Sequence, residues 1–262
     1  MVITLLVIIV VLLSAAIVLG VNVARYRAAR FQRGIFKQWP IPKVRVQEFD
    51  PRFTADEFGA TTAAEVAFIG VGNMAVSGAT NDFESWILAA MAKGASTMFE
   101  FGTCTGRTTY LWARNQPPNG RVITLTLAPD QLKAYKHETG DSEKDARFAR
   151  TESQFTRFRY SGTDVERRIV QLYGDSKEFD ETPYVDACDV VFVDGSHAYS
   201  YVVSDSQKAL RMVKPGGVVL WHDYKGSHRT PGVFRALNEL ARRLPLRHLA
   251  GTSLVAYRRP LT

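Results

Sequence analysis

From about residue 80 onward, strand-like and helical segments alternate along the chain, and this alternation leaves few possible folds. Apolar runs typical of buried strands cover residues 97–101, 122–125, 169–172, 189–193 and 218–221. Helical patterns cover residues 81–93, the segment after Gly106, 200–213 and 236–240. Because two parallel strands need a long crossover, usually a helix, this order predicts a doubly wound α/β domain with a mainly parallel sheet.

Local signals refine this outline at four places. Asn81 and Glu84 have the spacing of a capping box, which predicts the start of a helix at this point. Residues 246–257 read as two further strands around Gly251 and Thr252. The stretch 130–163 is polar and has no clear strand pattern, so we expect a helix and an irregular excursion there. Lys214-Pro215-Gly216-Gly217 is expected to end the helix before the strand at 218–221.

The N-terminus carries an uncharged apolar run from Val2 to Ala24. At about 1.5 Å per residue, a helix of this length covers the hydrocarbon core of a bilayer, roughly 30 Å. Seven cations follow it before the first acidic residue, Glu48: Arg25, Arg27, Arg30, Arg33, Lys37, Lys43 and Arg45. A cleaved signal peptide would have its cations before the apolar run, and cations after it favour a cytoplasmic location for that end.

We therefore predict a single-pass anchor at 1–24, a basic juxtamembrane linker at 25–45 and a folded domain at 46–262. The predicted location is the cell membrane, with the folded domain in the cytoplasm. The basic linker could contact anionic lipid, and a solvated charged linker explains it equally well.

The charge balance and the cysteines exclude several classes of protein. The net charge is +7, but without the seven linker cations the chain has 26 basic and 26 acidic residues. A neutral folded part argues against nucleic acid as a partner. Cys104 and Cys188 are the two cysteines, with no CxxC and no Cys/His cluster, which excludes a disulfide scaffold and a zinc finger.

Two glycine-rich loops are candidates for a cofactor site. The first, residues 68–75, places Gly70 and Gly72 in a GxGxxA pattern typical of dinucleotide-binding proteins. It predicts an NADP-dependent oxidoreductase as the alternative function. The pattern requires a helix immediately after the glycines, whereas residues 76–80 look like a turn.

The second loop, residues 99–109, places Glu100 at a strand end and then Gly102 and Gly106 before a helix. These glycines let the backbone approach a ligand closely, and the helix N-terminus offers unpaired N–H groups. The loop lacks the GxxxxGK pattern of a phosphate-binding P-loop.

This loop resembles motif I of the class I S-adenosylmethionine-dependent methyltransferases. The resemblance extends over about residues 80–257, because four further motifs follow in the family's order: Gly174-Asp175-Ser176, Asp194-Gly195-Ser196-His197, Lys214-Pro215-Gly216-Gly217 and Trp221-His222-Asp223-Tyr224. The nearest likeness is to a bacterial group similar in layout to the metal-dependent catechol O-methyltransferases. It implies a Rossmann-like methyltransferase domain at 46–262 that methylates the oxygen of a small hydroxylated acceptor.

The resemblance also implies which residues bind S-adenosylmethionine. The implied cofactor residues are Glu100, Gly102, Thr103, Gly106, Thr108, Thr126, Asp175, Ser176 and Asp194. The family usually has an acid at the end of the second strand, which holds the ribose hydroxyls. Here that place is Thr126, so Asp130 or a water would have to substitute.

The same resemblance implies a metal site and a base. Asp194, His222 and Asp223 take the places of the Mg²⁺ ligands, although a histidine shifts the expectation toward Mn²⁺, Fe²⁺, Zn²⁺ or no metal. His197 takes the place of the general base, with Asp223 as a second catalytic residue.

Plainer interpretations stay open for these residues. Asp194 could cap a helix, His197 could be a surface residue, and His222 with Asp223 could orient the substrate without a metal. A catalytically silent, membrane-tethered binding protein is a second alternative function, and the missing acid at Thr126 favours it. A homo-oligomer is also open.

Overall fold

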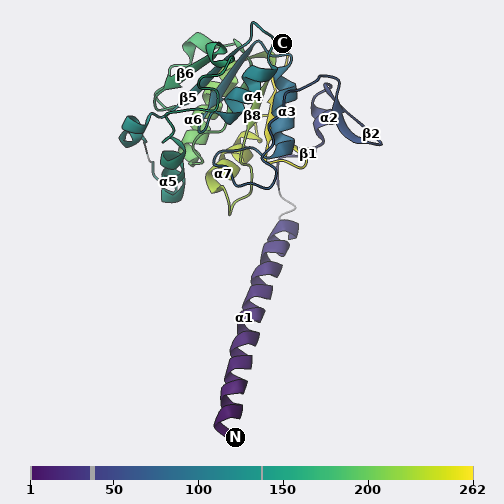
Figure 1. Cartoon of the computed structure of the whole chain (residues 1–262), viewed down its shortest axis with the longest axis vertical. Helices are drawn as coiled ribbons and strands as arrows, with labels where there is room; N and C mark the ends of the chain where they lie inside the picture. The colour runs from purple at the N-terminus through teal and green to yellow at the C-terminus, as the bar shows by residue number, and fades with distance from the viewer. Residues whose placement is uncertain (1, 36–38, 137, 262) are drawn as a thin grey trace. The chain divides into compact units, whose positions relative to one another are not determined.

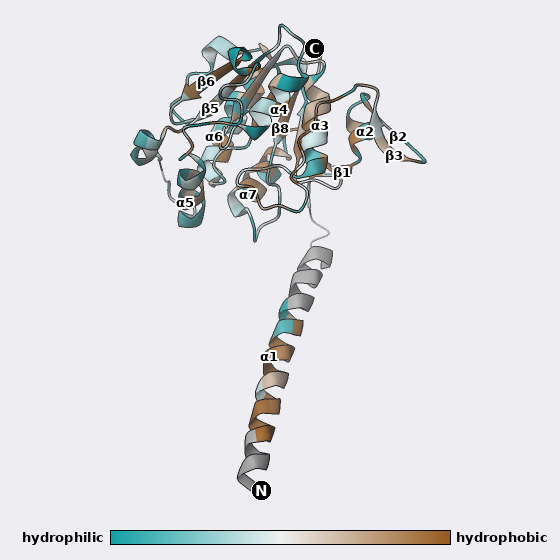
Figure 2. Ribbon diagram, viewed as in Figure 1, coloured by the Kyte–Doolittle hydropathy of each residue, from teal (hydrophilic) through white to brown (hydrophobic). Residues whose placement is uncertain are grey.

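The computed structural model describes residues 2–35, 39–136 and 138–261. The chain forms two compact units, Met1–Pro40 and Ile41–Thr262. The first contains helix α1, Val2–Ile35. Within it, Ile8–Arg25 is long and apolar enough to cross a membrane, properties that a signal sequence shares, and Figure 2 shows its hydrophobic colouring. The helix continues into the first part of the predicted linker, and residues 36–38 of that linker lie outside the described residues.

The second unit is built on a mainly parallel sheet (Figure 1). Within the described residues, its strand order is β1-β9-β10-β8-β7-β4-β5-β6. The strands are β1 Lys43–Val44, β4 Thr97–Phe101, β5 Arg121–Thr126, β6 Ile169–Tyr173, β7 Cys188–Val193, β8 Val213–Trp221, β9 Arg247–Leu249 and β10 Val255–Arg258. Neighbouring strands are parallel, except that β10 runs antiparallel to both β8 and β9. The predicted doubly wound sheet is confirmed.

Helices cover both faces of this sheet (Figure 1). The helices of this unit are α2 Val46–Phe49, α3 Asp82–Ala92, α4 Arg107–Asn115, α5 Glu143–Glu152, α6 Tyr199–Met212 and α7 Pro231–Leu240, with short 3-10 helices η1 Pro129–Ala134, η2 Glu166–Arg168 and η3 Thr182–Tyr184. Met98 and Phe192 point to one face and share a core with residues of α3 and α4. On the other face, the indole of Trp221 donates to Ser206 of α6 at 2.8 Å. Because successive side chains of a strand point to opposite faces, the sheet packs apolar residues against helices on both faces.

Two segments test the local predictions, and a third was not foreseen. Asn81 caps α3, and its side chain accepts from the Glu84 N–H while Glu84 accepts from the Asn81 N–H, as the capping box predicts. The Pro215-Gly216-Gly217 segment does not separate helix from strand, because β8 already begins at Val213. Instead, the pairing of β7 with β8 shifts register between Cys188 and Val190. A small hairpin, β2 Phe53–Asp56 with β3 Gly59–Thr62, was not predicted.

The strand order reverses direction between β4 and β7. The chain runs outward from β4 through β5 to β6 on one side, and from β7 to β8 on the other. In open parallel sheets a ligand crevice lies at the carboxyl ends of the strands at such a reversal. Gly102 follows β4 and Asp194 follows β7, so two of the predicted motifs meet at this point.

Candidate active site

An open cavity, with about 570 Å³ of empty space that includes the solvent at its mouth, lies at the carboxyl ends of β4, β5, β6 and β7. Five of the predicted cofactor residues line it: Gly102, Thr126, Asp175, Ser176 and Asp194. The wall is completed by residues from stretches without a sequence motif, including Tyr135 and the α5 residues Ala149 and Glu152.

Gly102 is required for the close approach of two loops. Its φ of 98° lies in the left-handed region, where a side chain is strained. A Cβ atom at this position would overlap with the backbone carbonyl of Asp194. The glycine therefore brings the loop after β4 against the loop after β7, and a larger residue would force them apart.

The other predicted cofactor residues support the glycine loop and do not line the cavity. Glu100 is buried and accepts hydrogen bonds from the hydroxyls of Thr109 on α4 and Thr124 on β5. Burial raises the pKa of Glu100 to about 8, so its carboxyl is mostly protonated at neutral pH. Thr103 bonds Thr124 at 2.7 Å, Gly106 is the N-cap of α4, and Thr108 is buried in its first turn.

The ribose side of the predicted site has an unusual set of groups. Thr126 lines the cavity at the end of β5, where the resemblance implies an acid. Asp130, the expected substitute, is exposed and does not line the cavity. Asp175 accepts from the Lys177 N–H and from the Tyr201 hydroxyl, both at 2.9 Å, so its orientation is fixed at the cavity wall.

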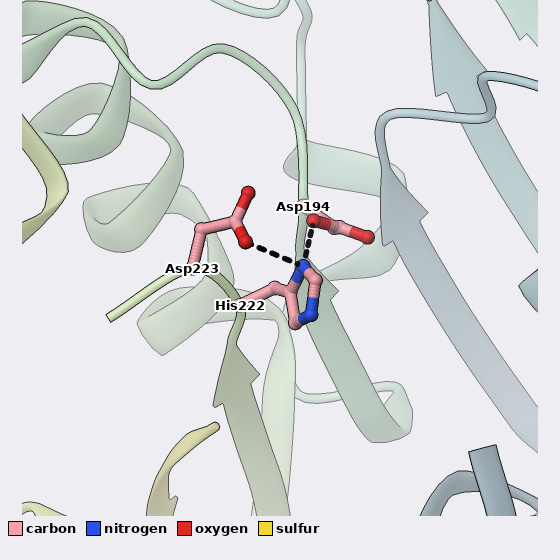
Figure 3. Close-up of side chains that lie close together, drawn as sticks. All are labelled: Asp194, His222 and Asp223. Atoms are coloured by element: carbon pink, nitrogen blue, oxygen red, sulfur yellow. Dashed lines mark hydrogen bonds and ion pairs between the residues drawn. The ribbon is translucent and has the colours of Figure 1, made fainter. Parts of the chain in front are cut away.

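A polar cluster lies beside the cavity at the ends of β7 and β8 (Figure 3). The Nδ1 atom of His222 lies 2.8 Å from Asp194 Oδ1 and 3.3 Å from Asp223 Oδ1. One ligand atom from each of these three residues lies within 4.8 Å of the others. Residues that are 28 positions apart in the chain thus converge because their strands are neighbours.

Glu84 holds His222 from the other side of the imidazole ring. Its Oε2 lies 3.2 Å from His222 Nε2, while its Oε1 accepts from the N–H and hydroxyl of Ser253. Hydrogen bonds and the charge of His222 outweigh burial and lower the Glu84 pKa to about 2, so this carboxylate is ionised.

This pairing bears on whether the cluster fits a metal. A carboxylate on one ring nitrogen holds its proton there and turns the other nitrogen toward a metal, which is the usual surrounding of a ligating histidine. Two carboxylates and one imidazole nitrogen suit Mn²⁺ or a similar cation better than Mg²⁺, which prefers oxygen alone. The donor set of Asp194, His222 and Asp223 therefore fits a divalent metal.

Asp223 also holds His197 at the cluster's edge. His197 Nε2 lies 2.5 Å from Asp223 Oδ2, and Lys225 pairs with the other oxygen of the same carboxylate. The ring of His197 stacks on Phe148 of α5, with 4.8 Å between ring centroids. The bond to Asp223 outweighs burial and raises the pKa of His197. Asp223 has a φ of 61°, an unfavourable conformation of a kind that clusters at functional sites.

In the first glycine-rich loop, residues 68–75, backbone N–H groups already bind the side chain of Asp82. The N–H groups of Val71 and Gly72 donate to the two carboxylate oxygens of Asp82 at 2.5 and 3.1 Å, and Arg107 donates to the Ile69 carbonyl. Within the described residues no strand leads into the loop, and the next helix, α3, begins only at Asp82. A dinucleotide pyrophosphate would need these N–H groups, so the oxidoreductase alternative is not favoured.

Comparisons with known proteins agree with this geometry. Residues 99–224 match the family described as a methyltransferase domain. No curated protein shows significant similarity to the chain.

Solved structures with a related arrangement include two methyltransferases. The O-methyltransferase TomG from Streptomyces achromogenes, solved with S-adenosylmethionine, is 20% identical over 69% of this chain and 82% of its own, with a TM-score of 0.46. The Bacillus cereus O-methyltransferase, solved with S-adenosylhomocysteine, is 19% identical over 70% and 84%, with a TM-score of 0.47. A Corynebacterium glutamicum protein is 13% identical over 70% and 83%, with a TM-score of 0.50, and shares the fold.

The family match begins in the strand that leads into the second glycine loop and ends at Tyr224, so it spans the motifs described above. Residues 99–224 thus form a methyltransferase domain, in agreement with the class I S-adenosylmethionine-dependent methyltransferase that the motifs predict.

Two acidic residues of the site were not predicted as such. Glu84 is visible in the sequence as the third residue of a capping box, but its contact with His222 spans 138 positions. Glu152 ends a helix in the stretch without a pattern. The capping box accounts for Glu84 locally and gives no sign of its contact with His222, and no motif marks Glu152.

Proposed function

We propose that this protein transfers a methyl group from S-adenosylmethionine to a hydroxyl oxygen of a small acceptor. The observation that carries the proposal is the His197–Asp223 pair beside the cofactor cavity. A second, smaller hollow is lined by His197, His222 and Asp223, and it shares Asp194, Gly195 and Ser196 with the larger cavity. An acceptor that binds there would lie next to the sulfonium.

His197 is suited to the role of general base. With its Nε2 proton donated to Asp223, the lone pair of Nδ1 is left to accept the acceptor's proton. No partner of this nitrogen is found among the residues that the structure describes. As the acceptor oxygen bonds to the methyl carbon, the carbon–sulfur bond breaks and its electron pair stays on sulfur. The proton moves to His197, and S-adenosylhomocysteine leaves as a neutral thioether.

A metal would be held by Asp194, His222 and Asp223, with Glu84 fixing the His222 ring. When bound, a divalent cation would lower the pKa of the acceptor hydroxyl. Mn²⁺ suits the donor set best, and Mg²⁺ is the alternative.

We also propose that α1 anchors the enzyme in the cell membrane, with the methyltransferase domain in the cytoplasm. The apolar segment Ile8–Arg25 and the cations that follow it support this proposal. Cytoplasm is also the compartment in which a cell's S-adenosylmethionine would be available to the domain.

Transfer of a labelled methyl group to a panel of small hydroxylated compounds tests the proposed reaction. We expect His197→Ala to lower turnover at neutral pH roughly a hundredfold or more, since a positioned base contributes about that much. Binding of S-adenosylhomocysteine should be unchanged. Exhaustive chelation should stop turnover and be reversed by Mn²⁺.

Two controls keep this assay interpretable. Arg235→Gln changes an exposed residue of α7 away from both hollows and should leave turnover unchanged. Full activity in His197→Ala would remove that residue from the mechanism, and activity that survives chelation would remove the metal.

A further inference from the structure

Glu152 presents a carboxylate to the cavity, and no described residue pairs with it. It is the last residue of α5, is half-buried and lines the cavity together with Gly102, Cys104 and Asp194. Among the residues that the structure describes, no hydrogen bond or ion pair to this carboxylate is found. Burial, reinforced by the nearby charge of Asp194, raises its pKa to about 7.

An unpaired acid in a cavity wall is costly to keep, because burial removes its water without supplying a hydrogen bond. A cationic group bound in the cavity would remove that cost. S-adenosylmethionine carries two such groups, the sulfonium and the α-ammonium of its methionine half.

The position of Glu152 selects the methionine half of the cofactor. Its carboxylate interacts electrostatically with Asp194, His197, His222 and Asp223, which all follow β7 and β8, and with the thiol of Cys104 in the loop after β4. It also lies against Gly78, 3.6 Å from the position that a Cβ atom would take there. The ribose end of the cavity, at Thr126 on β5, lies on the other side of β4.

The two cations differ in what happens to them during transfer. The sulfonium loses its charge as the methyl group leaves, so a carboxylate paired with it would stabilise the substrate more than the transition state. The α-ammonium keeps its charge throughout and can donate hydrogen bonds. A carboxylate that binds it contributes affinity without slowing the methyl transfer.

We propose that Glu152 binds the α-ammonium group of S-adenosylmethionine and so selects cofactors that carry the amino-acid half. This inference rests on the proposed function, since it requires the cofactor to occupy this cavity. Glu152 would then be a cofactor-binding residue on α5, outside all the sequence motifs.

Calorimetry with two ligands tests this assignment on the full chain in detergent. S-adenosylhomocysteine has the α-ammonium group, whereas 5′-methylthioadenosine has the same adenine and ribose but lacks the amino-acid half. We expect Glu152→Gln to weaken S-adenosylhomocysteine binding about tenfold, as a lost charge-assisted hydrogen bond would. Binding of 5′-methylthioadenosine should stay within twofold of wild type.

The controls separate this inference from its premise. Glu143→Gln, an exposed acid at the other end of α5, should change neither affinity, and an unchanged unfolding midpoint shows that Glu152→Gln folds. Equal affinity of wild type and Glu152→Gln for S-adenosylhomocysteine would overturn the inference alone. Equal weakening of both ligands would also overturn it. A wild-type chain that binds neither ligand would overturn the proposed function as well.

Discussion

At the scale of single residues, His222 is the centre of the site, because Glu84 contacts one nitrogen of its ring while Asp194 and Asp223 contact the other. Side chains of the site were predictable from the sequence where a motif carried them. Asp194, His222 and Asp223 follow strand-like runs, and parallel strands place such residues at one edge of the sheet. Glu84 and Glu152 were not predictable in their roles, because both depend on packing between distant segments. Glu84, for example, is fixed by Ser253, which lies 169 positions away. The sequence shows which residues end the strands but not which helix turns an acid toward them.

Glu100 gives a prediction about stability and pH. Its pKa is about 8 in the folded chain against an ordinary value of 4.5, so folding retains a proton that the unfolded chain releases above pH 4.5. The stability from the neutral, hydrogen-bonded acid is full below pH 4.5 and is lost as pH rises toward 8. At about 1.4 kcal/mol per pKa unit, the loss reaches a few kcal/mol.

Glu100→Gln keeps an acceptor for Thr109 and Thr124 but cannot ionise. We expect its free energy of unfolding, measured by urea denaturation, to fall less than that of wild type between pH 5 and 8. Other titrating groups are common to both proteins and cancel in the difference. Parallel curves for the two proteins would show that Glu100 is ionised in the folded state.

Secondary-structure elements were predicted well where their pattern was strong. The five central strands and the helix start at Asn81 all appear, because apolar periodicity and capping chemistry act locally. Besides the β2–β3 hairpin, two features were missed because they depend on tertiary contacts. Strand β1 at Lys43–Val44, within the predicted linker, forms only by pairing with β9. Gly216 and Gly217 lie inside β8, where backbone hydrogen bonds with Arg259 keep extended a Pro-Gly-Gly segment that would be a turn in isolation.

Helix α5 contributes residues to both parts of this site. It presents Phe148 to His197 and Glu152 to the cavity, one helical turn apart on the same face. Through these two residues it contributes to both the acceptor side and the cofactor side of the site. Because residues 130–163 carry no strand pattern, sequence reasoning located this helix only coarsely.

For the whole molecule, the proposal of a membrane anchor leads to a topology prediction. We expect the protein to sediment with the membrane fraction. A C-terminal fusion to a reporter that works only in the cytoplasm should be active, and a fusion to a reporter that works only outside the cytoplasm should be inactive. The cations after the apolar segment favour the cytoplasmic side for that end. Replacing Arg25, Arg27, Arg30 and Arg33 with Ala should reduce this orientation bias, whereas removing the same number of exposed arginines from the globular unit should not. A mature N-terminus beyond residue 20 would show a cleaved signal sequence instead.

The central claim is that S-adenosylmethionine binds in the cavity between the loops after β4 and β7, and Gly195 offers its most direct test. Gly195 lines the cavity, and a Cβ atom there would lie no closer than 3.7 Å to its neighbours, unlike one at Gly102. Gly195→Ala should therefore fold and bind S-adenosylhomocysteine nearly as well as wild type. Gly195→Leu should fold but lose binding at least tenfold in calorimetry, because its side chain fills the cavity. Wild-type affinity in Gly195→Leu would contradict the claim, since the cofactor would then lie elsewhere.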